Sequence, residues 1–64
     1  MNTKLKKAED FFELGNSLRD SGKLDDAVKN YKRAIELNPN HTIAHNDLGV
    51  LLIHLGKTNE AINN

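Results

Sequence analysis

Cysteine and tryptophan are absent from this 64-residue sequence, which contains one proline, four glycines, two phenylalanines and one tyrosine. The lack of cysteine excludes disulfides, a thiolate nucleophile and a Cys-based zinc site. A chain of this length buries only about 60% of the surface that its unfolded form exposes. The sequence therefore accommodates one small domain whose core no covalent cross-link reinforces.

Neither sign of charge predominates, because nine Lys and Arg residues balance nine Asp and Glu residues. The chain thus lacks the basic field that supplies most nonspecific affinity for nucleic acid, and we expect no nucleic-acid partner. The apolar run at 50–53 is far shorter than the roughly 20 residues of a spanning helix. The amino terminus has no secretory signal pattern. We therefore expect no membrane partner and a cytoplasmic location.

What the sequence does contain is helical periodicity. Gly22, the triplet at 38–40 and Gly56 divide the chain into segments, as glycine and proline commonly do. Apolar residues recur at steps of three and four, the pattern of helices with one buried face. We predict an all-α fold of antiparallel helices joined by short turns, with a short last element at 59–64. The stripes contain Leu5, Ala8, Phe11, Phe12, Gly15 and Leu18; then Leu24, Ala27, Val28, Tyr31, Ala34 and Ile35; then Ala44, Leu48, Leu51, Leu52 and Leu55.

The predicted helix ends have a chemical basis. We expect Gly22 to end the first helix in a left-handed conformation, and Asp25 to accept N–H groups at the start of the second. Pro39 is expected to stop the second helix. Asn40 or His41 can then cap the third.

The sequence also repeats itself at an offset of 34 residues. Leu14, Gly15 and Gly22 match Leu48, Gly49 and Gly56 at that offset. Further matches are Leu18 with Leu52, Lys23 with Lys57, Ala27 with Ala61 and Asn30 with Asn64. The third helix is therefore interpreted as a second copy of the first.

These residues resemble the tetratricopeptide repeat, whose period is 34 residues. The pattern consists of Phe11-x2-Leu14-Gly15-x2-Leu18, Ala27-x3-Tyr31, Ala34 and Pro39. The resemblance covers residues 8–64 and implies a single module, with repeat one at 8–41 and a partial repeat two at 42–64. Such a module is a fragment of an α-solenoid, and a face left uncovered on its last helix would require another repeat or another chain.

The resemblance also implies how the first hairpin packs. Gly15 and Ala27 allow a close approach of the two helices, and Leu14 and Tyr31 are among the residues expected to fill the surrounding space. The Tyr31 hydroxyl is expected to lie at the edge, in water. Ala34, together with Leu37, is expected to face the following helix.

The histidines offer the strongest candidates for a chemical site. His41 and His45 lie one helical turn apart, a spacing that two metal ligands can use. The sequence provides no evident third ligand and lacks the glutamate of a zinc-peptidase motif. We therefore interpret His45 as a packing residue and His41 as an exposed cap. We expect no metal, no cofactor and no enzymatic activity.

Binding is the function that the resemblance implies, because stacked hairpins expose a concave helical surface. The candidate partner-binding residues on that surface are Phe12, Asn16, Arg19, Asp47, Val50 and Ile53. An exposed Phe12 would serve as an apolar anchor, Asn16 would pair with a peptide backbone, and Arg19 would bind a carboxylate. The sequence therefore predicts a protein-interaction scaffold that binds a protein or peptide, in extended or helical form.

Two alternatives remain open at this stage. The chain could be the amino-terminal repeat segment of a larger enzyme, such as a protein glycosyltransferase that contains these repeats. It could also be a self-associating unit, a homodimer formed through Leu48, Leu51, Leu52 and Leu55.

Overall fold

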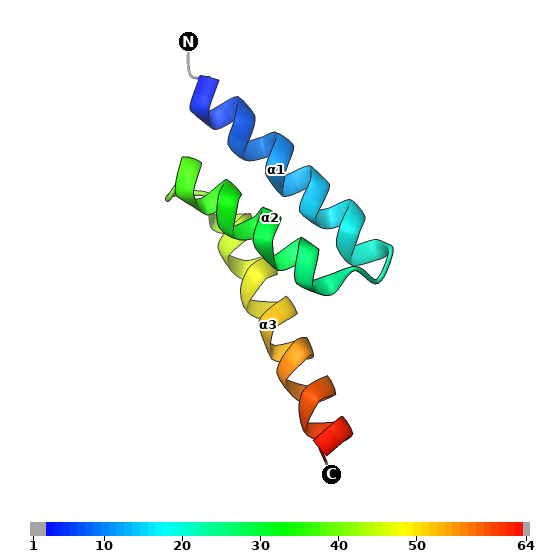
Figure 1. Cartoon of the computed structure of the whole chain (residues 1–64). Helices are drawn as coiled ribbons and strands as arrows, with labels where there is room; N and C mark the ends of the chain where they lie inside the picture. The colour runs from blue at the N-terminus through cyan, green and yellow to red at the C-terminus, as the bar shows by residue number, and fades with distance from the viewer. Residues whose placement is uncertain (1–2, 64) are drawn as a thin grey trace.

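A computed structural model describes the backbone of residues 3–63 and the side chains of residues 3–57. Helix α1 spans Thr3–Asp20, α2 spans Leu24–Leu37 and α3 spans Thr42–Asn63. Over the described residues every regular element is a helix (Figure 1). The all-α prediction is confirmed.

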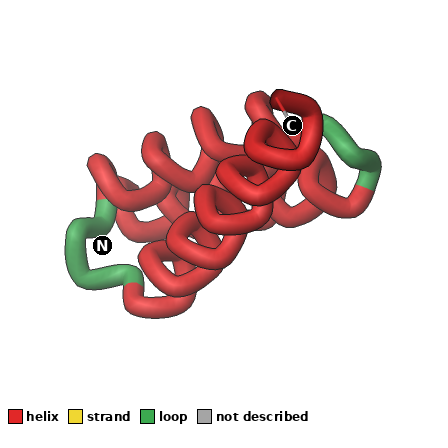
Figure 2. Tube along the Cα trace, turned by 90° about the horizontal axis from the view of Figure 1, so that it is seen from below, coloured by secondary structure: helices red, strands yellow, loops and turns green. Residues whose placement is uncertain are grey.

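The three helices form a hairpin and a projecting third helix. Helices α1 and α2 lie antiparallel, and α3 crosses α2 before running beyond the hairpin (Figure 1). The two turns lie at opposite ends of the hairpin (Figure 2). The projection of α3 gives the chain an elongated shape, 50 × 20 × 13 Å. Helix α3 therefore extends past the hairpin against which it packs (Figure 1).

The first turn is built on Gly22, which has a φ of +82°. The N–H of Gly22 donates to the carbonyl of Arg19 at 3.0 Å, and the N–H of Lys23 donates to the carbonyl of Leu18 at 2.8 Å. These two bonds form a Schellman motif and satisfy carbonyls at the end of α1. The expected glycine stop is confirmed.

The expected Asp25 cap is wrong. The residue that caps α2 is Lys23, and its side chain makes no capping hydrogen bond. Asp25 and Asp26 instead lie within the first turn of α2. Their negative charges are favourable there because the helix dipole is positive at this end.

The second turn follows Leu37, the last residue of α2. Asn38 is extended, with φ −139° and ψ 86°, as expected for a residue that precedes proline. The N–H of His41 donates to the Asn38 carbonyl at 3.0 Å. The His41 ring then accepts a hydrogen bond from the N–H of Ala44 through Nδ1 at 3.1 Å. Of the two predicted caps of α3, His41 is the one that the structure uses.

Helix α3 differs from the prediction at Gly56. We expected a turn at this glycine, by analogy with Gly22, but α3 continues through it to Asn63. A glycine permits a turn without imposing one, because it adopts helical dihedrals as well as left-handed ones. A Cβ atom on Gly56 would meet nothing within 4 Å, so no tertiary contact bends the chain back there.

The core lies where α2 packs against both other helices. Tyr31, Ala27 and Ala34 are fully buried, and Ala44 and Leu51 of α3 belong to the same cluster. Ala34 of α2 therefore belongs to the same buried cluster as two residues of the third helix. Partly buried residues around this cluster are Phe11, Leu18, Leu24, Val28, Ile35, Leu48 and Leu55.

Leu14 was expected in the core of the hairpin, and Leu37 was expected to face the third helix. Leu14 is 49% exposed, and both Leu14 and Leu37 line a pocket on the side of the hairpin between α1 and α2. Leu14 is exposed because α1 packs against α2 through another of its faces. Ala8, Phe12 and Gly15 are its buried residues, and Leu14 does not share their face of the helix.

Candidate functional site

The candidate site is a pocket of about 310 Å³ between α3 and the end of the hairpin that carries the first turn. Its apolar lining comes from α2 and α3, and its charged lining comes from α1 and α3. The lining residues are Arg19, Leu24, Asp47, Val50, Leu51 and His54. Three predicted partner-binding residues therefore meet at one pocket: Arg19, Asp47 and Val50.

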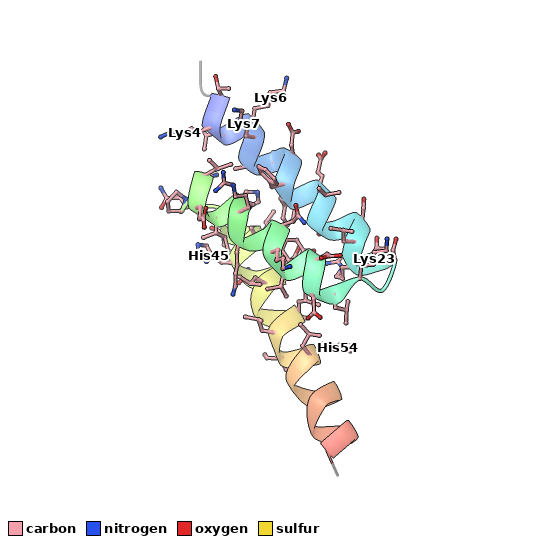
Figure 3. The ribbon with its side chains drawn as sticks, in the orientation of Figure 1. Lys4, Lys6, Lys7, Lys23, His45 and His54 are labelled. Carbon is pink, nitrogen blue, oxygen red and sulfur yellow. The ribbon has the colours of Figure 1, made fainter. Side chains whose placement is uncertain are left out.

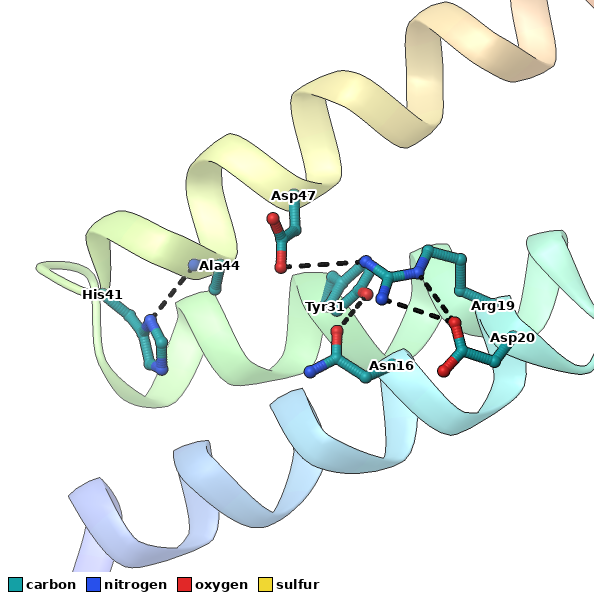
Figure 4. Close-up of polar contacts among 7 residues, drawn as sticks. All are labelled: Asn16, Arg19, Asp20, Tyr31, His41, Ala44 and Asp47. Atoms are coloured by element: carbon teal, nitrogen blue, oxygen red, sulfur yellow. Dashed lines mark hydrogen bonds and ion pairs between the residues drawn. The ribbon is translucent and has the colours of Figure 1, made fainter.

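An ion pair links α1 to α3 at this pocket. The Arg19 guanidinium lies 3.9 Å from an Asp47 carboxylate oxygen and 3.4 Å from one of Asp20 (Figure 4). The Arg19 and Asp47 side chains are 40% and 30% exposed. A long pair in contact with water contributes little to stability. Both charges are therefore accessible to a partner at little energetic cost.

Beside this pair, Asn16 binds Tyr31 within the chain. The Tyr31 hydroxyl donates to the amide oxygen of Asn16 at 2.5 Å (Figure 4). Burial raises the pKa of this hydroxyl above its ordinary value of 10.0; Arg19 opposes the rise, and Asp47 and Asp20 add to it. The expectation that the hydroxyl lies in water is wrong, because Tyr31 is fully buried. The Asn16 oxygen is thus already engaged, which leaves its amide N–H groups for a partner.

The prediction of an exposed Phe12 is wrong. Phe12 is only 8% exposed, and its ring centroid lies 5.7 Å from that of Tyr31 and 4.8 Å from that of His41. It packs inside the hairpin because it shares a helix face with Ala8 and Gly15, four residues before it and three after it. The neighbouring small residues were the signal in the sequence that this face is the tightly packed one.

The other predicted residues of α3 are on the surface. Val50 is 68% exposed and Ile53 is 62% exposed, but only Val50 lines the pocket. Of the leucines expected to form a homodimer, Leu51 is 3% exposed and is buried in the core. Leu48 and Leu55 also pack against that core. Leu52, at 46% exposed, is the member of this set that remains accessible.

The two histidines differ from the prediction in their exposure, although His41 keeps its expected role as the cap of α3. His45 is exposed, and its Nε2–H donates to the Pro39 carbonyl at 2.9 Å. The His41 side chain is 11% exposed. Because Nδ1 of His41 accepts from Ala44, its Nε2–H donates to Glu9 at 3.0 Å. Among the described side chains, no group of three or more His, Cys, Asp or Glu residues could hold a metal ion.

A second pocket, of about 440 Å³, lies between α1 and α2. Its lining residues are Lys7, Asp10, Phe11, Leu14, Arg33 and Leu37. The Arg33 guanidinium lies 5.9 Å from the centroid of the Phe11 ring and binds Glu36 at 2.8 Å. Lys4, Lys6 and Lys7 extend from the amino-terminal end of α1, on the opposite side of the molecule from the projecting part of α3 (Figure 3).

The family resemblance placed His54 on the concave face as well, and His54 lines the 310 Å³ pocket. Sequence reasoning missed two residues of this pocket as binding residues, Leu24 and Leu51. Leu24 was predicted as a core residue, and Leu51 as a core residue and a possible dimer contact; apolar periodicity indicates each of these roles equally well. A residue at the edge of a core can also line a pocket, and only the angle at which α3 crosses α2 determines this. No sequence signal distinguishes the two roles.

Comparison with known proteins identifies the family to which this chain belongs. The TPR repeat family matches residues 15–56, and the chain belongs to this tetratricopeptide repeat family. It is 40% identical over 57 residues to the RNA polymerase-associated protein CTR9 of Caenorhabditis elegans. That alignment covers 88% of this chain and 5% of the nematode protein. No solved structure shows a significant match.

Membership of this family indicates a general function, which is binding to other proteins. Tetratricopeptide repeats mediate contacts between proteins, and the family typically provides scaffolds without enzymatic activity. Over the described residues, none of the helices is both long and apolar enough to cross a membrane.

Proposed function

We propose that this chain binds a partner protein at the pocket between the hairpin and α3. The observation that carries the proposal is the convergence of Arg19, Asp47 and Val50 on one pocket of about 310 Å³. Leu24 and Leu51 add apolar surface to the lining. A pocket with an apolar floor and a charged rim suits one apolar side chain of a peptide or helix, flanked by polar groups.

The ion pair defines the polar part of this recognition. A carboxylate of the partner competes with Asp47 for Arg19, and a cationic group competes with Arg19 for Asp47. Either exchange is cheap because the existing pair is long and partly hydrated. The similar nematode protein is named as RNA polymerase-associated, so we extend the proposal to a partner from such an assembly.

The test compares proteins captured by the tagged chain and by two matched variants. Val50→Asp places a charge in the pocket, and Leu14→Asp places the same charge on an exposed leucine that lines the other pocket. We expect partners captured by the parent chain to be retained by Leu14→Asp and lost by Val50→Asp. Circular dichroism checks that both variants stay folded. Capture of the same partners by all three proteins would refute the proposed site.

A further inference from the structure

The charges at the 310 Å³ pocket do not balance. Among its described lining residues, Arg19 is the one arginine or lysine, and it faces two carboxylates. Its guanidinium lies 3.9 Å from an oxygen of Asp47 and 3.4 Å from an oxygen of Asp20 (Figure 4). With histidine counted as neutral, these three side chains leave the rim of the pocket with one excess negative charge, although the chain as a whole has none.

The lysines of the chain do not cancel this excess. Those at the amino-terminal end of α1 extend away from the pocket (Figure 3). Lys7 precedes Arg19 by about 18 Å along the helix, and exposed charges more than about 8 Å apart are largely screened at physiological salt. Lys23 lies at the first turn, but Asp25 and Asp26 follow it in the first turn of α2. The carboxylates at the pocket therefore outnumber the cations close to it.

Further carboxylates lie along the side of α1 that borders α3. Glu9, Glu13 and Asp20 are spaced by four and seven residues, so they share one side of the helix. Glu9 contacts His41 just before α3 begins, and Asp20 contacts Arg19 at the pocket. Glu13 is exposed between them. The negative charge at the pocket thus continues along this side of α1.

We propose that the partner segment bound at this pocket carries a lysine or arginine beside its apolar anchor, and that Asp47 and Asp20 bind this cation. The inference rests on the proposed function, in which the apolar floor of the pocket receives the anchor. At the rim a cation gains two attractions and meets one repulsion, whereas a carboxylate meets two repulsions and gains one attraction. One such interaction at about 4 Å in water changes affinity about fivefold. The pocket therefore selects basic segments over acidic ones.

The partner cation can bind without displacing Arg19. The contacts of Arg19 with Asp20 all use Oδ1, and its contact with Asp47 uses Oδ2. A carboxylate has about four lone-pair sites on its two oxygens. The Asp20 and Asp47 side chains are 73% and 30% exposed, so an incoming ammonium or guanidinium group can reach both.

The test uses three peptides of the form acetyl-Gly-Leu-X-X-Leu-Gly-amide, in which X is lysine, glutamine or glutamate. Each is titrated into the ¹⁵N-labelled full chain, and the amide shifts of Asp47 and Val50 are followed by NMR. The leucines supply the same anchor in all three, and glutamine is the neutral reference. We expect the lysine peptide to bind about fivefold more tightly than the glutamine peptide, and the glutamate peptide to bind most weakly. Raising the salt from about 0.1 M to about 1 M should remove most of this preference, because it shortens the screening length from about 10 Å to about 3 Å.

Asp47→Asn is the decisive variant, because it removes one carboxylate from the rim and preserves the shape of the side chain. Arg19 and Asp20 then cancel, so the lysine and glutamine peptides should bind about equally. Asp10→Asn is the matched control, since it removes the same charge from the lining of the other pocket. It should preserve the lysine preference. Circular dichroism checks that both variants stay folded.

The outcomes separate this inference from the proposed function. Equal binding of the three peptides at Val50 would overturn the cation preference and leave the proposed pocket standing. Tighter binding of the glutamate peptide, or a lysine preference that survives Asp47→Asn, would overturn it in the same way. Absence of binding by all three peptides would overturn it as well, and the capture experiment with Val50→Asp judges the proposed function independently.

Discussion

The ring of Tyr31 lies so close to Gly15 that a methyl group on Gly15 would approach two ring carbons to 2.8 Å. The same Cβ would lie 3.4 Å from the backbone carbonyl oxygen of Ala27. Backbone on one side and a buried ring on the other leave no room for a side chain. This contact fixes the distance between α1 and α2, and it also places the Tyr31 hydroxyl beside Asn16.

Alanine at the two matched glycines should therefore have opposite effects. Gly15→Ala is expected to destabilise the chain by about 1 to 3 kcal/mol, because the Tyr31 ring must move. Gly49→Ala is expected to stabilise it by up to about 1 kcal/mol through helix propensity alone. Urea unfolding followed by circular dichroism measures both. Shifts of the same sign at the two positions would contradict the packing described for Gly15.

The Asn16–Tyr31 hydrogen bond predicts an asymmetry between its two partners. Asn16→Ala leaves the buried hydroxyl of Tyr31 without an acceptor, at a cost of about 1 to 3 kcal/mol. Tyr31→Phe leaves only a half-buried amide that water can reach, so we expect a smaller loss. Adding Asn16→Ala to Tyr31→Phe should then cost little more. A double-mutant cycle from urea unfolding tests this, and additive losses would show that the bond contributes nothing.

Ionisation of Tyr31 predicts how stability changes at alkaline pH. Because burial raises the pKa of its hydroxyl above 10.0 in the folded chain, the unfolded chain loses this proton first. The protonated Tyr31 hydroxyl therefore contributes stability that is fully present below the pKa of the unfolded chain. This stability is lost as the pH rises through the pKa of the folded chain. Tyr31 is the single tyrosine, so phenolate absorbance reports its titration directly. The folded chain should titrate at higher pH than the chain in denaturant, and Tyr31→Phe should remove this part of the alkaline loss.

His41 makes three contacts with two helices: it caps α3 at Ala44, and on α1 it binds Glu9 and contacts the Phe12 ring. His41→Ala removes all three contacts, and loss of the cap alone costs about 0.5 to 2 kcal/mol. His41→Asn is the informative control because asparagine is a good cap that cannot make the same ring contact. We expect it to recover part of the loss in thermal unfolding. Equal destabilisation by both variants would show that the cap is not the stabilising contact.

The continuity of α3 is testable at its second glycine. Gly56 lies inside a helix, whereas Gly22 has a φ of +82°. Gly56→Ala should increase the helical circular dichroism signal, because alanine is favoured over glycine in a helix by about 1 kcal/mol. Gly22→Ala should destabilise the chain by about 1 kcal/mol or more, since a Cβ atom is strained in the left-handed region. A loss of helix in Gly56→Ala would indicate a turn there instead.

Local patterns predicted most of the secondary structure. The turn at Gly22, the stop before Pro39, the cap by His41 and the three helices all depend on short stretches of chain. At Gly56 the same reasoning failed, because a glycine allows a turn but only packing of the following segment makes the chain adopt one. The repeat offset predicted that α1 and α3 are copies. It did not predict that they would pack through different faces.

The sequence by itself determined the helices, the repeat and the family, because hydrophobic periodicity and turn residues act over a few neighbouring positions. Tertiary structure alone decided that His45 is exposed, since rotation of a helix about its axis exchanges adjacent residues between core and surface. It also decided that Arg19, Asp47 and Val50 meet at one pocket. Residues on separate helices come together only through the angle at which α3 crosses the hairpin. Ala34 of α2 and Ala44 and Leu51 of α3 form one buried cluster at this crossing, and their packing determines the angle.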